Sequence, residues 1–176
     1  MDEKRIALVT GASRGIGRAT AVELARAGYY IVINYNASEA AASETLAQVQ
    51  ASGAAGEIRK FDVSGAAEVK EALAGIMEEH KRIDVLVNNA GVTRDGLFLM
   101  MGEDEWHTVI NTTLNGFYNV TKPVLREMVR KKRGAIVSVS SISSLVPNRG
   151  QANYAAAKAG INAATSSLAK EVARFG

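Results

Sequence analysis

The sequence predicts an α/β fold, a doubly wound parallel sheet with helices on both of its faces. Two observations support this prediction. Short apolar runs alternate with longer helical patterns five times along the 176 residues, and a glycine-rich turn follows the first apolar run. Because no internal repeat or linker interrupts the alternation, we expect a single domain over residues 1–176.

Five segments, most of them short apolar runs, are the expected strands of this Rossmann-type sheet. They cover residues 6–9, 30–33, 56–61, 84–87 and 135–139. Runs that are apolar throughout, rather than alternating, are typical of strands that helices cover on both faces. We expect strand order 3-2-1-4-5, with the ligand at the carboxyl ends of the strands, where the order reverses between the first and the fourth.

Helical patterns fill the intervals between the strands. They cover residues 16–27, 38–50, 64–81, 103–132 and 153–175. Gly28 is the expected end of the first helix, and Ser38 is the expected N-cap of the second. Pro123 predicts a kink or a frayed turn in the long helix. Residues 88–102 and 143–151 are expected to be loops, and the fifth strand is expected to leave an exposed sheet edge.

Composition and charge narrow the class of function. The net charge is +3, and positive and negative residues are interspersed except at Arg130–Arg133, so we predict an acidic ligand or partner rather than nucleic acid. With no cysteine and two histidines, the chain is not expected to bind a metal ion. No apolar run reaches about 18 residues and the start lacks a signal-peptide pattern, which predicts a cytoplasmic protein without a membrane segment.

The turn after the first strand has the residues that a dinucleotide phosphate needs. Gly11 permits a tight turn, Gly15 permits close approach of the backbone to a phosphate, and Gly17 lets the next helix pack on the strand. The first amides of that helix supply donors and a partial positive charge. The expected phosphate-binding residues in this turn are Gly11, Ser13, Arg14, Gly15, Ile16 and Gly17.

The end of the second strand indicates which dinucleotide binds. A carboxylate there accepts hydrogen bonds from the ribose hydroxyls of NAD. The chain has Asn34, Tyr35 and Asn36 instead, and Arg14 stands in the glycine turn, near the place of a 2′-phosphate. These residues favour NADP, with Asn36 among the binding residues. The alternative is that Arg14 is simply solvated.

Two further segments are expected to line the same site. Asp62 and Val63 follow the third strand, where a carboxylate can accept from an adenine amino group and a valine can pack on the ring. A turn carboxylate is the alternative for Asp62. Asn89, Ala90 and Gly91 follow the fourth strand, and their small side chains leave room for a ribose at the expected switch point of the sheet.

Tyr154 and Lys158 are the candidate catalytic pair. Residues four apart on a helix lie on one face, one turn apart. An ammonium held beside a phenol favours the phenolate, which makes the tyrosine a proton donor and acceptor at neutral pH. Ser141 follows the fifth strand, and its hydroxyl is expected to hold a carbonyl oxygen that Tyr154 protonates. An exposed helix face is the alternative for the Tyr-Lys spacing.

Together these motifs resemble the short-chain dehydrogenase/reductase family. The resemblance rests on the turn from Thr10 to Gly17, on Asp62, on Asn88–Gly91, on Ser141, and on Tyr154 with Lys158, and within the family it is greatest for the bacterial 3-oxoacyl-[acyl-carrier-protein] reductases. It implies that NADPH reduces a 3-oxoacyl thioester to its 3-hydroxy form, with Tyr154 as the proton donor and Lys158 also holding the nicotinamide ribose.

The resemblance also implies partners. Similar enzymes are homo-oligomers, dimers or tetramers, joined through two long helices, which are here residues 103–132 and 153–175. Such reductases carry an arginine that docks the acidic acyl-carrier protein, and Lys132 in the basic run takes its place here. A solvated helix end is the alternative for this run. The resemblance implies neither nucleic acid nor membrane as a partner.

Two departures from the family pattern affect the expected function. Thr113 stands where the family has a fourth catalytic residue, an asparagine, and Asn111 and Asn115 lie about 200° round the helix from it. Family members also continue past the last helix into further strands, so we expect an incomplete sheet. These departures leave two alternatives open, a reductase of another small carbonyl compound and a nucleotide-binding module without turnover.

Overall fold

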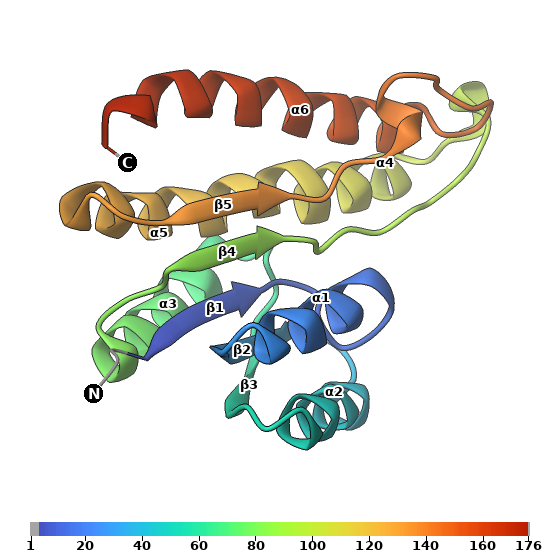
Figure 1. Cartoon of the computed structure of the whole chain (residues 1–176). Helices are drawn as coiled ribbons and strands as arrows, with labels where there is room; N and C mark the ends of the chain where they lie inside the picture. Colours follow the sequence, from blue (N-terminus) through green and yellow to red (C-terminus); the bar gives the residue numbers. More distant parts are fainter. Residues whose placement is uncertain (1–3, 176) are drawn as a thin grey trace.

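The computed structural model describes residues 4–175. Five parallel strands form one sheet in the order β3-β2-β1-β4-β5, which confirms the predicted topology. The strands are β1 (Arg5–Val9), β2 (Tyr29–Tyr35), β3 (Gly56–Lys60), β4 (Val85–Asn88) and β5 (Ala135–Ser138). The arrows of β1, β4 and β5 point the same way in Figure 1, so the loops after them meet at one edge of the sheet.

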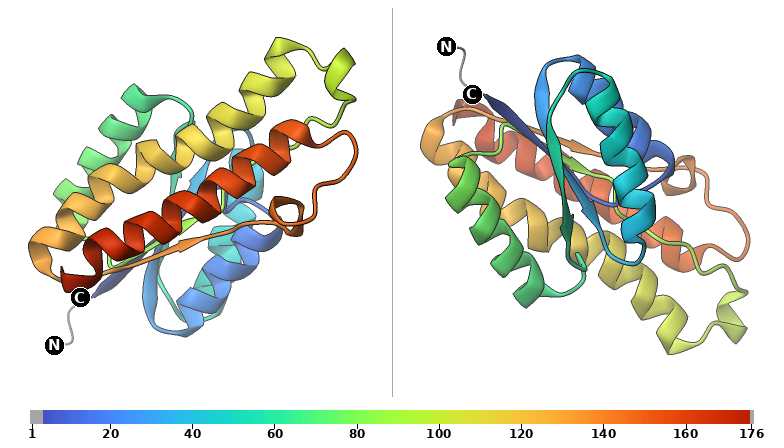
Figure 2. Two further views of the ribbon diagram at one scale, coloured as in Figure 1. Left: turned by 90° about the horizontal axis from the view of Figure 1, so that it is seen from above. Right: turned by 90° about the horizontal axis from the view of Figure 1, so that it is seen from below.

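Helices cover both faces of the sheet, because neighbouring residues of a strand point to opposite faces. Ile6 and Leu8 of β1 face a core shared with α3 and α5, whereas Ala7 and Val9 face a second core shared with α1 and α2. Figure 2 shows these two layers from above and from below. The helices are α1 (Gly15–Arg26), α2 (Glu39–Ala51), α3 (Ala66–His80), α4 (Glu103–Ile110), α5 (Gly116–Lys131) and α6 (Ala152–Val172).

The long helix predicted over residues 103–132 has an irregular turn in its middle. α4 ends at Ile110, residues Asn111–Asn115 form a π-helical turn, and α5 begins at Gly116. The frayed turn offered as one possibility at Pro123 is wrong, because α5 continues through that residue. A π-turn inserts one extra residue into the helix and re-aims the side chains next to it, and such turns are frequent at functional sites.

Capping residues and glycines mark the ends of several helices. The Ser38 hydroxyl accepts from the amide of Ala41 and caps α2, as predicted. Gly28 has a φ of 83° just beyond α1. The two segments predicted as loops hold short 3-10 turns, η1 (Phe98–Met100) and η3 (Ile142–Ser144), and a third, η4 (Ala173–Phe175), follows α6.

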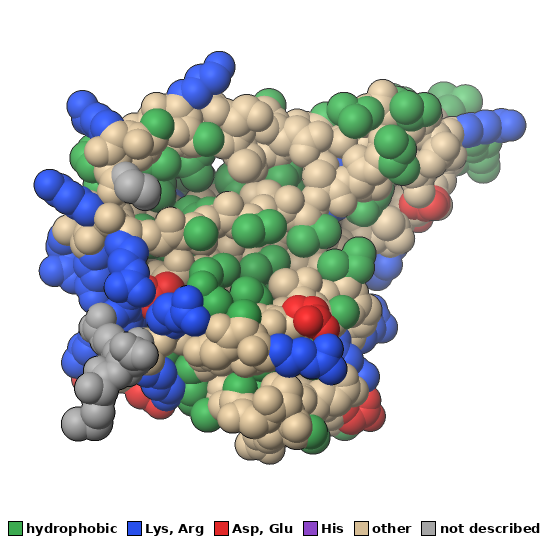
Figure 3. Space-filling view, viewed as in Figure 1, with side chains coloured by type: hydrophobic (Ala, Val, Ile, Leu, Met, Phe, Trp, Pro, Cys, Tyr) green, Lys and Arg blue, Asp and Glu red, His purple; other side chains and the backbone are tan. Residues whose placement is uncertain are grey.

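β5 lies at one edge of the sheet. Its Val137 is 51% exposed, and hydrophobic side chains cross the middle of Figure 3, over the place of β4 and β5 in Figure 1. The exposed edge predicted for the fifth strand is therefore present. Within residues 4–175, no helix has both the length and the apolar character needed to cross a membrane.

Candidate active site

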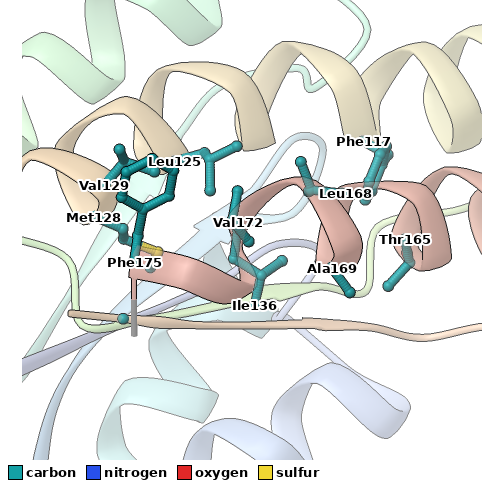
Figure 4. Close-up of a pocket in the computed structure, with 11 residues that line it drawn as sticks. Phe117, Leu125, Met128, Val129, Ile136, Thr165, Leu168, Ala169, Val172 and Phe175 are labelled. Carbon is teal, nitrogen blue, oxygen red and sulfur yellow. The ribbon is translucent and has the colours of Figure 1, made fainter. Parts of the chain in front are cut away.

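Two cavities differ sharply in their chemistry. One, of about 170 Å³, lies between α5, β5 and α6, and the side chains that point into it are almost all apolar (Figure 4). Phe117, Leu168 and Val172 are among them, and Thr165 supplies the only side-chain hydroxyl of its lining. This cavity has no group that can transfer a proton at neutral pH.

The second cavity, of about 500 Å³, lies at the carboxyl edge of the sheet. Segments that follow β1, β2, β3 and β4 line it, and Thr108 of α4 and Thr112 of the π-turn complete the wall. Nine of the residues predicted to bind the cofactor are in its lining: Gly11, Ser13, Arg14, Asn36, Asp62, Val63, Asn89, Ala90 and Gly91. Gly15, Ile16, Gly17, Ser141, Tyr154 and Lys158 are not part of the lining.

The glycine turn has the shape that the spacing predicted. Gly11 has a φ of 60°, and a Cβ atom on it would lie 2.9 Å from the Cα atom of Ala90. A Cβ atom on Gly17 would lie 2.5 Å from Nδ2 of Asn89 and 2.6 Å from the carbonyl oxygen of Gly11. Gly15 has a φ of 56° with open space around it. The turn therefore requires glycine at these positions for two different reasons, close packing and backbone conformation.

The start of α1 fits a phosphate group. Its first turn holds no acidic residue, and no side chain caps its first amides. Arg14, just before the helix, is exposed and lines the cavity, and Ile16 is 65% exposed. Free amide donors, a helix dipole and a nearby guanidinium together attract an anion. The residues present therefore fit the pyrophosphate of a dinucleotide.

Two polar residues, Asn34 and Thr10, hold the walls of this cavity together. Asn34 accepts from the amide of Gly11 at 3.0 Å and donates to the carbonyl of Phe61 at 2.9 Å, so it joins the glycine turn to the segment after β3. The hydroxyl of Thr10 accepts from the amides of Asn89 and Ala90, both at 3.0 Å. The sequence interpretation gave Asn34 and Thr10 no separate role, although their place at strand ends was a usable signal.

Asp62 has local partners as well as a place in the cavity wall. One carboxylate oxygen accepts from the amide and the hydroxyl of Ser64, at 2.8 and 2.7 Å, in a turn of the kind offered as its alternative role. The other oxygen accepts from Nδ2 of Asn36 at 2.9 Å. Asp62 and Asn36 are thus tied to each other in the wall of the cavity.

Lys158 is buried although it carries an ammonium group. It is 3% exposed, and its Nζ donates to the carbonyl oxygen of Val139 at 2.6 Å. The same Nζ lies 5.8 Å from the ring centre of Tyr154, one turn earlier on α6. Burial lowers the pKa of the Lys158 ammonium, because a charge loses hydration when it leaves water. The protein keeps this costly group beside the half-buried tyrosine.

Lys158 also reaches toward the cavity. A Cβ atom on Gly91, which lines the cavity, would lie 3.6 Å from Nζ of Lys158 and 3.4 Å from the hydroxyl oxygen of Thr113. Thr113 is 1% exposed, and its hydroxyl has no hydrogen-bond partner among the described residues. Asn111 and Asn115 bond to each other at 2.7 Å, on exposed positions of the same turn, and do not replace it.

Ser141 stands at the start of η3, which packs against α6. Its hydroxyl oxygen accepts from the amide of Ser143 at 3.2 Å, which leaves its proton free to be donated. The hydroxyl of Ser144 donates to the carbonyl of Ser141 at 2.6 Å and accepts from Nδ2 of Asn162 on α6 at 2.8 Å. η3 is therefore fastened to the helix that carries Tyr154, although Ser141 and Tyr154 share no direct hydrogen bond.

Three features define the class of this protein. They are the glycine turn before α1, the polar cavity at the carboxyl edge of the sheet, and the buried Lys158 one turn after Tyr154 on α6. The class is the dinucleotide-dependent oxidoreductases of the doubly wound fold. The family model described as short chain dehydrogenase matches residues 5–176. The chain belongs to this family and is a short-chain oxidoreductase.

Several curated proteins of one name are similar to this chain in sequence. A 3-oxoacyl-[acyl-carrier-protein] reductase of Synechocystis is 44% identical over 172 residues, which are 98% of this chain and 70% of the relative. Proteins of the same name are 43% identical over 176 residues in Staphylococcus aureus, where 100% of this chain and 72% of the relative are covered, and in Escherichia coli, where the shares are 99% and 70%.

Proposed function

We propose that the protein reduces a 3-oxoacyl thioester, carried by acyl-carrier protein, to the 3-hydroxyacyl form with NADPH, as a step of fatty acid synthesis. The observation that carries the proposal is the buried ammonium of Lys158, placed between the ring of Tyr154 and the cavity-lining Gly91. The names of the relatives support the choice of substrate.

The proposed cofactor is NADP, and the cavity residues divide its parts among them. The turn from Gly11 to Gly17 would hold the pyrophosphate, Asp62 and Val63 the adenine, and Asn89, Ala90 and Gly91 the ribose and nicotinamide. Arg14 and Asn36 would flank the 2′-phosphate. Both line the cavity, and neither brings a negative charge to it.

The residues of α6 and η3 would manage the proton and the carbonyl oxygen. When bound, the reduced nicotinamide supplies the hydride. The Ser141 hydroxyl would donate to the substrate carbonyl and orient it, and the Tyr154 hydroxyl would give its proton to the oxygen as charge develops there. Lys158 would stabilise the phenolate that remains, since a nearby ammonium favours the charged form.

Two proposals concern partners. Lys132, in the basic run at the end of α5, would contact the acidic carrier protein. Its side chain is exposed and has no hydrogen bond or ion pair among the described residues, whereas Lys131 donates to the carbonyl of Lys81 and Arg130 pairs with Glu127. The protein would act in the cytoplasm as a homo-oligomer, joined through the α4–α5 helix and α6.

The test is NADPH oxidation with acetoacetyl-acyl-carrier protein as substrate. We expect turnover by the purified protein, and loss of at least about 100-fold in kcat for Tyr154→Phe with unchanged NADPH affinity, because general acid catalysis contributes about 10²–10⁴-fold. Turnover of free ketones but not of the thioester would point to another carbonyl substrate. NADPH binding without turnover of either would overturn the proposal in favour of a binding module.

A further inference from the structure

Asn153 is the most thoroughly bonded side chain at the start of α6. It is 0% exposed and directly precedes Tyr154. Its Nδ2 donates to the carbonyl oxygen of Arg94 at 2.9 Å and to that of Glu105 at 3.3 Å, while its Oδ1 accepts from the amide of Tyr154 at 2.7 Å. Both amide protons and the amide oxygen are therefore in use, so the side chain is held in one orientation.

The three partners of Asn153 belong to three different segments. Arg94 lies in the loop that leaves β4 and lines the cavity at residues 89–92. Glu105 lies in α4, whose Thr108 also lines the cavity. The amide of Tyr154 lies in the first turn of α6, where helix amides have no partner within the helix. One side chain thus connects two cavity walls to the backbone of the tyrosine.

Contacts beside Asn153 support the same connection. The Gln151 side chain donates to a carboxylate oxygen of Asp95 at 3.0 Å. The amide of Gly96 donates to the carbonyl of Gly150 at 2.9 Å. The segment before α6 is therefore joined to residues 94–96 at three neighbouring points. Asn153 is the buried member of this set, and its hydrogen bonds compete least with water.

We propose that Asn153 is a positioning residue, whose side-chain amide fixes Tyr154 relative to the cofactor cavity. The inference rests on the proposed function for its kinetic consequence, but its structural consequence is independent of any substrate. Removal of the two donated bonds leaves residues 94–96 held only by the more exposed contacts of Gln151 and Gly150, so the loop loosens from α6 and the tyrosine ring can depart from its place. A misplacement of about 1 Å at a reacting group costs on the order of 100-fold in rate.

The decisive variant is Asn153→Asp, which keeps the volume and the acceptor for Tyr154 but puts an oxygen in the place of Nδ2, against the carbonyl oxygens of Arg94 and Glu105. Two further variants extend the series if the aspartate variant fails to fold. Asn153→Ala loses both side-chain donors, and Asn153→Ser retains one donor. Ile76→Val is the control, because Ile76 is fully buried in α3, away from the cavity lining, and its truncation lowers stability without touching this network.

Two readouts separate positioning from a loss of folding. We expect kcat with acetoacetyl-acyl-carrier protein to fall at least about 10-fold, with KM and the dissociation constant of NADPH within about threefold of wild type. We also expect faster amide hydrogen exchange in residues 92–101 for the Asn153 variants, and unchanged exchange there for Ile76→Val.

Equal kcat, or unchanged exchange in residues 92–101, in a folded Asn153 variant would overturn the inference. So would the same loss of kcat in Ile76→Val at a matched melting temperature. If wild type itself does not reduce the thioester, the proposed function fails, and hydrogen exchange alone then decides the inference about Asn153.

Discussion

The buried hydroxyl of Thr113 and the buried ammonium of Lys158 face the same point above Gly91, at 3.4 and 3.6 Å from the place of a Cβ atom there. Thr113 comes from the π-helical turn and Lys158 from the middle of α6, so two distant segments bring their polar groups together beside the cavity. The Thr113 hydroxyl has no hydrogen-bond partner among the described residues, and the Lys158 ammonium donates to the backbone carbonyl of Val139 and not to a side chain. Both groups are therefore costly to bury.

Thr113→Val is expected to stabilise the protein. Valine has nearly the same shape and removes a buried hydroxyl that has no hydrogen-bond partner among the described residues. Because such a group costs about 1–3 kcal/mol to desolvate, the free energy of unfolding in urea should rise by about 1 kcal/mol. Thr121→Val is the control, since the Thr121 hydroxyl accepts from Asn88 at 2.9 Å and its loss should destabilise. A fall in stability for Thr113→Val would show that its hydroxyl has a partner in solution.

Lys158→Met is expected to abolish turnover while the protein remains as stable as wild type or becomes more stable. The variant removes a buried charge whose hydrogen bond is to the carbonyl of Val139, and it retains most of the side-chain volume. Thermal unfolding and NADPH oxidation, measured on the same sample, check the two halves of this prediction. Measurable turnover, or a melting temperature lower by more than about 5 °C, would contradict it.

The stability difference between Lys158→Met and wild type should depend on pH. Burial lowers the pKa of Lys158 in the folded state below its value in the unfolded chain. Below the folded-state pKa both states are protonated, and the cost of burying the charge is fully present. As pH rises between the two pKa values, the folded protein has lost the proton that the unfolded chain keeps, so wild type gains stability relative to the variant. Urea unfolding from pH 7 to pH 10 should show the difference shrinking, and a constant difference would contradict this.

Gly17→Ala and Gly15→Ala should differ in their cost to stability. A methyl group on Gly17 meets Nδ2 of Asn89 and the carbonyl of Gly11, so the turn must shift, with a loss of about 2–3 kcal/mol. Gly15 has open space, and alanine there suffers only from the φ of 56°, at about 1 kcal/mol. Urea unfolding of both variants without cofactor measures the difference. Equal losses would mean that the packing around Gly17 is less tight than the structure shows.

Asn36→Asp tests the proposed preference for NADPH. The new carboxylate stands next to that of Asp62, to which Asn36 now donates at 2.9 Å, and on a wall that would face the 2′-phosphate. We expect kcat/KM for NADPH to fall by at least about 10-fold, with a smaller change for NADH, because like charges repel. Arg14→Ala should lower the ratio of kcat/KM for NADPH to kcat/KM for NADH in the same way. Arg26→Ala, at the far end of α1, should leave this ratio unchanged. An unchanged ratio in Asn36→Asp would remove this wall from the 2′-phosphate site.

Lys132→Glu tests the contact with the carrier protein. Figure 3 shows Lys and Arg side chains gathered at the left end of the molecule, where α5 ends in Figure 1. Reversal of one rim charge mainly slows association, so kcat/KM for the carrier-bound substrate should fall about fivefold at low salt and less at high salt. A small acetoacetyl thioester without the carrier is the matched control. Wild type and Lys132→Glu should reduce it with the same kcat/KM. Equal losses with both substrates would contradict docking at Lys132.

Several features of the fold could be predicted because their causes are local. Apolar runs placed β1, β2, β4 and β5, the glycine turn placed the start of α1, and the cap at Ser38 placed α2. The charged β3 was found from its place between two helical patterns. The π-turn at Asn111–Asn115 escaped prediction, since its residues form a regular helical pattern in the sequence. Pro123 does not end the helix, although proline breaks isolated helices, because α5 packs against α3 and the sheet on both sides of it.

The sequence by itself determined the family, the strand order, and the spacing that sets Tyr154 one turn before Lys158, because helix and strand periodicity are properties of neighbouring residues. The tertiary structure decided how that pair is held. The bond that Asn153 donates to Arg94 joins residues 59 apart, and the bond that Gly11 donates to Asn34 joins residues 23 apart. The Thr113 hydroxyl and the Lys158 ammonium come to the same side of Gly91 only in the finished fold. Such contacts depend on which loops the sheet brings to its carboxyl edge, and no local pattern specifies them.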